Sequence, residues 1–187
     1  VTQRPVNVDL EKTYDATTDV AASDLKTNGI TNTVLGHSLS LSGAGTMAST
    51  GVGLDKTVST GTLSLTGGQA SNYTLTGGTH TIDVNPRTTN ASGTRHYDGT
   101  VSVNGSAFST FTNVVGLDTV TISGSGTITT NANVGSKGVS LGTLQSAHPN
   151  YILGNASLTV TQRPVSLTGS KLEDGKLIET IVGAIEW

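Results

Sequence analysis

The chain has 187 residues, of which 12% are charged, a net charge of −3 and no cysteine. This length is enough for one large or two small domains, and the lack of cysteine excludes disulfides and thiolate metal sites. The ten Lys and Arg residues are scattered, which excludes a basic surface for nucleic acid. No apolar run reaches the roughly 18 residues of a membrane span. We therefore expect neither a nucleic acid partner nor membrane insertion.

Threonine, serine and glycine dominate the composition with 33, 20 and 24 residues, whereas aromatic residues make up only 4%. β-Branched threonine favours extended backbone and glycine supplies turns. The composition therefore predicts an all-β protein with a core of small aliphatic side chains. The opening residues VTQRPVNV do not look like a signal peptide, so we expect a mature or excised segment.

Alternation of apolar and polar residues, which is typical of half-buried strands, recurs along the chain. In chain order it is found at residues 37–45, 61–68, 118–130 and 155–163. Asn-Gly steps, which are strong hairpin-turn signals, lie at 28–29 and 104–105, and Gly pairs lie at 67–68 and 77–78. These patterns predict small antiparallel domains of about six to eight short strands.

The tail has a different pattern. Its apolar residues fall at helical spacing, at Leu177, Ile178, Ile181, Val182 and Ile185. The same residues suit a strand, so a short helix and a strand stand as equal alternatives.

Three segments of the chain begin alike. VTQRPV opens the chain at residues 1–6 and returns at 160–165, and VNPRTT at 84–89 is a degenerate copy. Ten residues after the arginine of each segment comes a second motif, at Tyr14-Asp15-Ala16, Tyr97-Asp98-Gly99 and Glu173-Asp174-Gly175. Two later landmarks recur as well, around Lys56 and Lys137 and around Tyr73 and Tyr151.

The repeats divide the chain into residues 1–84, residues 85–162, and residues 163–187 as the start of a third repeat or a C-terminal tail. The last strand of one repeat is expected to run into the next, which favours a stiff rod. A parallel β-helix is the rival fold, but its rungs repeat at about 20–30 residues or fewer, whereas these units repeat at about 80. Two tandem antiparallel β-sandwich (Ig-like) domains are therefore expected.

This order of motifs resembles the YDG-type repeats of large Gram-negative surface adhesins, the filamentous-haemagglutinin-like exoproteins exported through an outer-membrane partner. The resemblance rests on the Arg-Pro opening, the Tyr-Asp-Gly element, the Val-Gly…Lys…Val element and the Asn-Tyr landmark, and it covers nearly all of residues 1–165. Ala16 and Glu173 depart from the pattern. The resemblance implies a secreted or outer-surface protein of a Gram-negative bacterium.

The stretch RHYDGT, residues 95–100, gathers an imidazole, a phenol and a carboxylate. The equivalent stretch of the first repeat is EKTYDA, which lacks the histidine that a catalytic base would require. We therefore expect no enzyme. Instead, Tyr14 and Tyr97 are expected to be core aromatics, Asp15 and Asp98 to hydrogen-bond their own turns, and Gly99 to take a positive φ.

Lys56 and Lys137 suggest a second hypothesis. A desolvated lysine beside an acid can form an amide cross-link, and the pairs Lys56–Asp15 and Lys137–Asp98 occupy equivalent places. A surface lysine or a salt bridge is the simpler interpretation. Tyr73 and Tyr151 are expected to pack between sheets.

No cofactor is expected, because the four histidines lack ligand spacing and the acids do not form a calcium loop. A calcium ion at a joint between repeats is compatible with a rod, although no motif demands one. The sequence thus favours a structural stalk module of a bacterial adhesin that supports adhesion and biofilm formation, with neighbouring repeats as partners. The alternative is a module of the same adhesin that binds polysaccharide or a host protein.

Overall fold

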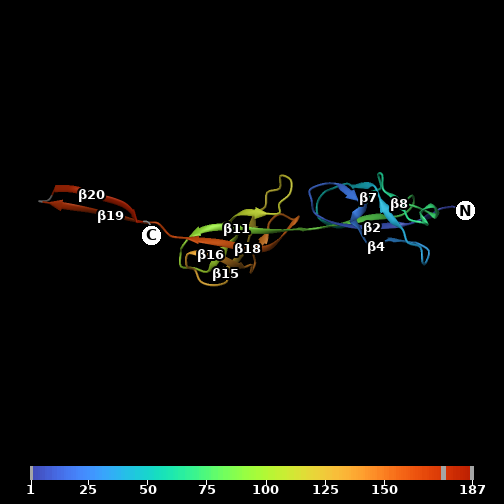
Figure 1. The fold of residues 1–187 in the computed structure, drawn as a ribbon. Coiled ribbons are helices and arrows are strands. Elements are labelled where there is room, and N and C mark those ends of the chain that lie inside the picture. The colour runs from blue at the N-terminus through green and yellow to red at the C-terminus, as the bar shows by residue number, and fades with distance from the viewer. Residues whose placement is uncertain (1, 174–175, 186–187) are drawn as a thin grey trace. The chain divides into compact units, whose positions relative to one another are not determined.

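The computed structural model describes residues 2–173 and 176–185 of the chain. It is all-β, with two tandem curled β-sheet domains (Figure 1). By compactness the chain divides into two units. Unit 1 consists of residues Val1–Thr89, Asn113–Val120 and Ser146–Ile152, and unit 2 consists of Asn90–Thr112, Thr121–Gln145 and Leu153–Trp187. Unit 1 therefore includes two segments from the second sequence repeat.

The first domain is built on a six-stranded sheet in the order β3-β6-β7-β10-β2-β4. These strands are β2 (Asn7–Thr13), β3 (Asp19–Ala21), β4 (Leu25–Thr31), β6 (Ala44–Met47), β7 (Gly53–Ser59) and β10 (His80–Asn85). Two short pairs complete it, β1 (Arg4–Pro5) with β9 (Tyr73–Thr74) and β5 (Ser40–Ser42) with β8 (Ser64–Thr66). Single 3-10 turns lie at Ala22–Asp24 (η1) and Ala70–Asn72 (η2).

The second domain repeats this order as β12-β15-β16-β18-β11-β13. Its strands are β11 (Arg87–His96), β12 (Ser102–Asn104), β13 (Phe108–Thr112), β15 (Ser125–Ile128), β16 (Gly135–Ser140) and β18 (Tyr151–Thr161). β14 (Ile122–Ser123) pairs with β17 (Gln145–Ser146), and the 3-10 turn η3 spans Gly105–Ala107. Because the two strand orders correspond one to one, the sequence repeat is also a structural repeat.

The cores of both domains consist of small aliphatic side chains on alternating strand positions, as the composition predicts. In β2 the buried residues are Val8 and Leu10, and in the adjacent β10 they are Ile82 and Val84. Leu158 and Val160 of β18 occupy the matching positions in the second domain. In the described part of the chain, no helix has the length and apolar character needed to cross a membrane.

The expectation of purely antiparallel sheets is wrong. β2 and β10 are parallel, with His80 opposite Val8 and Asn85 opposite Thr13, and β1 and β9 are parallel too. A parallel pair needs a long crossover connection, and here strands β3 to β9 provide it. Alternation within each strand does not reveal which strand lies alongside or in which direction, so it could not distinguish parallel from antiparallel pairing.

The two Asn-Gly steps are not hairpin turns, and this prediction is also wrong. Asn28 and Gly29 lie inside β4, where Asn28 takes a φ of 60° and the pairing of β2 with β4 is irregular. A Cβ on Gly29 would lie 2.3 Å from the Asp9 carbonyl oxygen. Glycine is thus required there for a close backbone approach within a bulge, not for a turn.

The tail forms a two-stranded antiparallel pair, β19 (Val165–Glu173) with β20 (Lys176–Ile185). The helical alternative is therefore wrong. The β-branched residues in β20 favour extended backbone, and β19 supplies a partner strand for its hydrogen bonds. Asp174 and Gly175, which belong to the third copy of the Tyr-Asp-Gly motif, lie outside the described residues.

Candidate functional site

The Tyr-Asp motif of each repeat is a turn that the aspartate stabilises from within. Asp15 Oδ1 accepts hydrogen bonds from the Thr17 amide and hydroxyl, both at 2.9 Å. Asp98 Oδ1 accepts the same two bonds from Thr100, at 2.9 and 3.0 Å. This is the local side-chain-to-backbone pattern for which aspartate is favoured in turns, and it agrees with the expectation from sequence.

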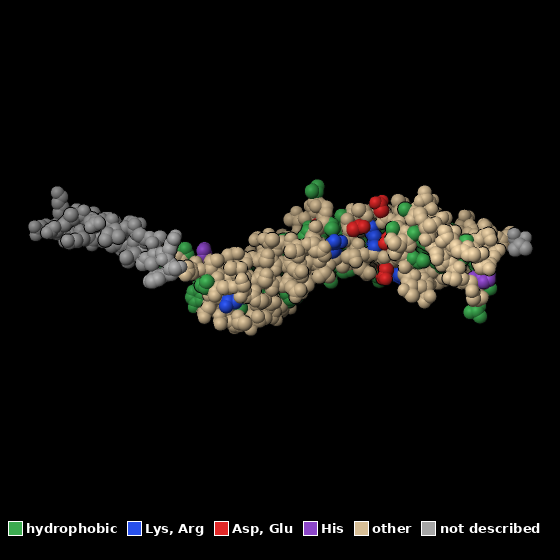
Figure 2. Space-filling view, in the orientation of Figure 1, with side chains coloured by type: hydrophobic (Ala, Val, Ile, Leu, Met, Phe, Trp, Pro, Cys, Tyr) green, Lys and Arg blue, Asp and Glu red, His purple; other side chains and the backbone are tan. Residues whose placement is uncertain are grey.

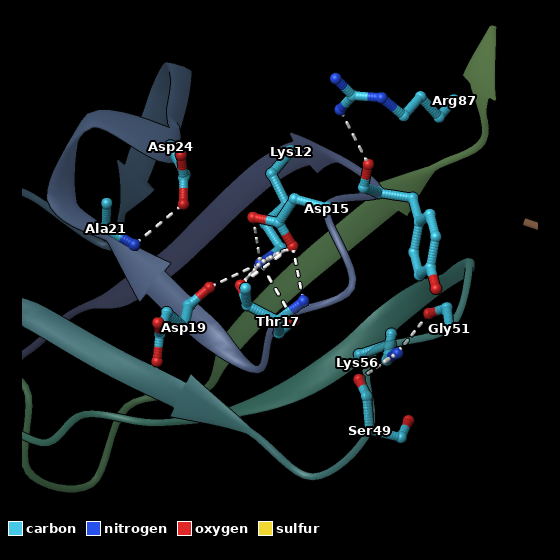
Figure 3. Close-up of polar contacts among 11 residues, drawn as sticks. Lys12, Asp15, Thr17, Asp19, Ala21, Asp24, Ser49, Gly51, Lys56 and Arg87 are labelled. Carbon is cyan, nitrogen blue, oxygen red and sulfur yellow. Dashed lines mark hydrogen bonds and ion pairs between the residues drawn. The ribbon is translucent and has the colours of Figure 1, made fainter. Parts of the chain in front are cut away.

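A basic residue on the strand before each turn holds the same aspartate. Lys12 lies 3.0 Å from Asp15 and also donates to the Thr17 and Asp19 carbonyls, as Figure 3 shows. Burial alone would raise the pKa of Asp15, but the Thr17 amide and the Lys12 ammonium hold it below its ordinary value. The Asp15 carboxylate is therefore held by its own turn and by Lys12 in one polar network.

In the second repeat, Arg95 replaces Lys12 in this role. It lies 3.3 Å from Asp98 and donates to the Thr100 and Ser102 carbonyls. The Thr100 amide lowers the pKa of Asp98 most strongly, and Arg95 lowers it further. His96, the other candidate for chemistry in this stretch, contacts the Gln162 carbonyl and the Thr161 hydroxyl through Nδ1.

The third position of the motif has a left-handed backbone in both repeats. Gly99 has a φ of 76° and Ala16 a φ of 65°. Glycine adopts this conformation readily, whereas an L-residue is strained by about 1–2 kcal/mol. Ala16, which stands where the second repeat has Gly99, therefore keeps the same turn at an energetic cost.

Replacing Ala16 by glycine is expected to raise the free energy of unfolding by about 1 kcal/mol, because relief of left-handed strain exceeds the added chain entropy. The reciprocal Gly99→Ala change is expected to lower it by a similar amount. Urea unfolding of the two variants beside the unmodified chain measures both changes. Equal effects of the same sign would contradict this explanation.

Tyr14 is buried in unit 1, with 3% of its surface exposed. Its hydroxyl donates to Asp118 Oδ2 at 2.9 Å, and the Tyr151 hydroxyl donates to the same oxygen at 2.8 Å. The two rings meet edge to face with centroids 5.6 Å apart, a favourable aromatic geometry. We call Tyr14, Asp118 and Tyr151 the tyrosine cluster.

Backbone contacts fix both tyrosines of the cluster in unit 1. The Tyr14 amide donates to the Asn85 carbonyl, and Arg87 donates to the Tyr14 carbonyl at 3.2 Å (Figure 3). Arg87 also reaches Asn113 Oδ1 at 2.7 Å, and the Tyr151 hydroxyl accepts the Val115 amide. The recurring arginine of the repeat opening thus has a structural role that its sequence position did not reveal.

Burial and the hydrogen bond to Asp118 raise the pKa of Tyr14, and burial likewise raises that of Tyr151. Because the folded-state pKa of each tyrosine is raised, its contribution to the free energy of unfolding is complete below the unfolded-state pKa of about 10. This contribution is lost as the pH rises through the higher folded-state pKa. Unit 1 is therefore expected to lose stability in alkaline solution.

Urea unfolding between about pH 8 and about pH 11 tests this prediction. We expect the free energy of unfolding to fall at the alkaline end, and to fall less in the Tyr14→Phe variant. The Tyr97→Phe variant is the matched control and should follow the unmodified chain. A pH dependence that Tyr14→Phe leaves unchanged would show that the cluster is not its source.

Tyr97 is not a core residue, and that prediction is wrong. It is 40% exposed, although its amide donates to the Thr161 carbonyl just as the Tyr14 amide donates to Asn85. The backbones of the two motifs thus make equivalent hydrogen bonds, but only the Tyr14 side chain is buried. Tyr14 is buried because unit 1 includes Asp118 and Tyr151, and this long-range packing has no signal in the motif itself.

Tyr73 is buried, and its surroundings match those of Tyr151. Its hydroxyl accepts the Val34 amide at 3.0 Å, as Tyr151 accepts Val115. His37 Nδ1 lies 2.7 Å from the Tyr73 hydroxyl. His37 follows Val34 by three residues, as Asp118 follows Val115, so the histidine stands where the second repeat has the aspartate.

The cross-link hypothesis requires Lys56 beside Asp15 and Lys137 beside Asp98, but in the structure both lysines have other partners. Lys56 donates to the Ser49 and Gly51 carbonyls (Figure 3), and burial lowers its pKa. Lys137 donates to Asn131 Oδ1 at 3.1 Å. Among the described contacts neither lysine meets Asp15 or Asp98, which are held by Lys12 and Arg95. An intact mass equal to that of the sequence would exclude both bonds.

An ion pair that sequence reasoning missed joins three adjacent strands of the first domain. Lys26 of β4 lies 2.7 Å from Asp83 of β10 and 2.9 Å from Asp9 of β2. Hydrogen bonds to Asp83 and then Asp9 raise the pKa of Lys26 above its ordinary value. Only the strand order brings these residues together, so no local spacing could have identified them.

An open groove of about 860 Å³ lies on unit 1. Its lining is rich in hydroxyl groups and glycine and includes Ser59, Thr60, Ser64 and Thr76. Tyr73 also lines it, but that ring is buried. Over the part of the chain that the structure describes, no group of three or more His, Asp or Glu side chains is placed to hold a metal ion.

Comparison with known proteins gives one result. The sequence model of the YDG domain matches residues 2–82 and again residues 81–161. Searches of the curated proteins and of the solved structures found no match. The two matched stretches agree with the two structural repeats and contain the two Tyr-Asp turns.

Proposed function

Because the chain belongs to the YDG domain family, with copies at residues 2–82 and 81–161, we propose that it is a stalk segment of a large bacterial adhesin. The proposed adhesin is secreted or held on the outer surface of a Gram-negative cell, where it supports adhesion and biofilm formation. In this role each copy is an Ig-like sandwich, and tandem copies form a stiff rod that projects a distant binding tip.

The observation that carries this proposal is the tyrosine cluster. One compact unit takes Tyr14 from the first copy and Asp118 and Tyr151 from the second. A buried, hydrogen-bonded contact of this kind couples neighbouring copies, because opening it exposes aromatic surface and leaves polar groups without partners. Such coupling is useful in a stalk and unnecessary in independent binding modules.

The surface chemistry also suits a spacer. Charged side chains are few, and neutral atoms dominate the face shown in Figure 2. Tandem small domains gain stability from their neighbours, so a long array can be stable although each copy of about 80 residues buries only a modest core. The chain also lacks cysteine, so folding after export requires no disulfide formation.

Small-angle X-ray scattering of the purified chain tests the stalk proposal. We expect the profile of an elongated, stiff particle whose cross-section is that of a single domain. The Tyr14→Ala variant should scatter as a more flexible particle at the same mass. A compact particle, or a flexible one for the unmodified chain, would contradict the proposal.

The groove on unit 1 supports a second candidate function, a module that binds polysaccharide or a host protein. Its hydroxyl-rich lining could hydrogen-bond a sugar. However, sugar sites commonly stack a ring on an aromatic side chain, and the tyrosine in this lining is buried. We therefore rank this function second.

A further inference from the structure

The first long strand and the last strand of the first domain lie side by side. These strands are β2 and β10, and they occupy the interior of the sheet, between β4 and β7. They run in the same direction, with His80 opposite Val8 at one end and Asn85 opposite Thr13 at the other. The backbone therefore enters this pair at one end, through β2, and leaves it at the opposite end, through β10.

This arrangement decides how the domain carries tension along the chain. A pull on the start of β2 and on the end of β10 slides the two strands past each other in opposite directions. Backbone hydrogen bonds lie across the strand direction, so all six residue pairs of the register are loaded together. In an antiparallel hairpin the two free ends lie together, and the same pull would open one pair at a time.

The surroundings of the two strands add to the resistance. β10 also pairs with β7, and β2 also pairs with β4, so neither strand can slide without breaking a second set of hydrogen bonds. Leu10 and Ile82 lie opposite each other and are both fully buried. Sliding would drag these side chains through a packed core, and water cannot readily replace the hydrogen bonds beside them.

Further hydrogen bonds join the two ends of the pair. At the first end, the Val8 amide donates to the Thr79 carbonyl at 3.0 Å, and the Asn7 side-chain oxygen accepts the Thr79 amide at 2.9 Å. At the other end, the Tyr14 amide donates to the Asn85 carbonyl at 2.8 Å. The contact between the two pulled segments is thus longer than the strand register itself.

The second copy repeats the arrangement with β11 and β18, which are neighbours in its sheet (Figure 1). The Arg87 amide donates to the Asn150 carbonyl near the start of both strands, and the Tyr97 amide donates to the Thr161 carbonyl near their ends. The two strands therefore also run in the same direction. Only Pro86 separates β10 from β11, so tension that leaves the first pair enters the second directly.

The asparagine at the first end is also present in both copies. Asn90 Oδ1 accepts the Asn155 amide at 3.0 Å, as Asn7 accepts Thr79. Nearby core positions differ between the copies, since Gly93 of β11 pairs with Phe108, whereas Leu10 of β2 pairs with Leu25. The side-chain bond across the parallel strands is therefore kept where the packing next to it has changed.

We propose that the β2–β10 pair and the β11–β18 pair are mechanical clamps, which keep each copy folded when the chain is pulled along its length. The clamp is a property of the strand order, so it acts on tension from any source. The proposal does not depend on the stalk function, because a receptor module that is held while its ligand is pulled would bear the same load.

Force spectroscopy on single molecules, pulled in two directions, tests the proposal. The chain has no cysteine, so pairs of introduced cysteines can define the two points of attachment. Thr2→Cys with Asn85→Cys pulls the strands of the first clamp past each other. Thr2→Cys with Thr76→Cys pulls on the same end of both strands and opens them pair by pair. All three native side chains are exposed.

We expect a rupture force several-fold higher in the sliding direction than in the opening direction. The same folded domain is pulled in both cases, so the difference reports the direction of loading and not the free energy of unfolding. Equal forces in the two directions would overturn the proposal.

Three variants, pulled in the sliding direction, separate the clamp from overall stability. Asn7→Ala removes the bond to Thr79 and is expected to lower the rupture force. Asn90→Ala makes the same change in the second copy, which is not loaded between these attachment points, and should leave the force unchanged.

Gly43→Ala is the second control, because Gly43 lies outside both clamp strands. It is expected to lower the free energy of unfolding in urea and to leave the rupture force unchanged, since its surroundings are still intact when the clamp breaks. Two results would overturn the proposal. One is an Asn7→Ala variant with the unmodified rupture force, and the other is a Gly43→Ala variant that lowers this force as much as Asn7→Ala does.

Discussion

Replacing Tyr14 by alanine is expected to destabilise unit 1 by about 3–5 kcal/mol, the usual cost of removing a buried aromatic side chain. The change removes the edge-to-face contact with Tyr151 and leaves a cavity beside it. It also takes one of the two tyrosine hydroxyl donors from Asp118. A loss of this size is comparable to the whole stability of a small domain.

The matched control is Tyr97→Ala, which alters the same motif position in the second copy. Because Tyr97 is 40% exposed, we expect a loss of less than about 1 kcal/mol. Urea unfolding of both variants measures the difference between the two positions. Losses of equal size would mean that the two tyrosines are equally buried, which would contradict the tyrosine cluster.

Replacing Gly43 by alanine is expected to cost about 3 kcal/mol for two combined reasons. Gly43 has a φ of 84°, where an L-residue is strained. A Cβ at this position would also lie 2.2 Å from the Thr62 carbonyl oxygen, so the loop between β7 and β8 would have to shift. The equivalent Gly124 shows the same combination, with a φ of 87° and the Thr143 carbonyl at 2.1 Å.

Gly36 separates the two causes. Its φ is also 84°, but a Cβ there would have no atom within 4 Å. Gly36→Ala is therefore expected to cost only the backbone strain, about 1 kcal/mol. Thermal unfolding followed by circular dichroism compares the two variants. A Gly36 variant as unstable as the Gly43 variant would show that crowding at Thr62 contributes little.

The repeat architecture could be predicted from the sequence because its signals are local. Alternation predicted all-β structure, and the ten-residue spacing from arginine to tyrosine aligned the copies correctly. The aspartate turns could also be predicted, since Asp15 and Asp98 bond residues only two positions away. A positive φ at Gly99 followed from the residue type alone.

The tyrosine cluster could not be predicted, because its members are far apart in sequence. Asp118 lies 104 residues from Tyr14, and nothing around it marks it as an acceptor. The motif therefore predicted that Tyr14 and Tyr97 would both be buried in the core. The Lys26 ion pair and the parallel pairing of β2 with β10 were missed for the same reason, since both depend on strand order.

The role of this chain as a spacer is tested most directly by its binding to sugars. We would probe a broad glycan array and the polysaccharide of the producing cells with the folded chain, beside an unrelated β-sandwich as control. The stalk proposal predicts no saturable binding to any sugar class. Saturable binding to one class, lost when Thr60 and Ser64 of the groove are replaced by bulkier residues, would contradict it and establish a receptor module.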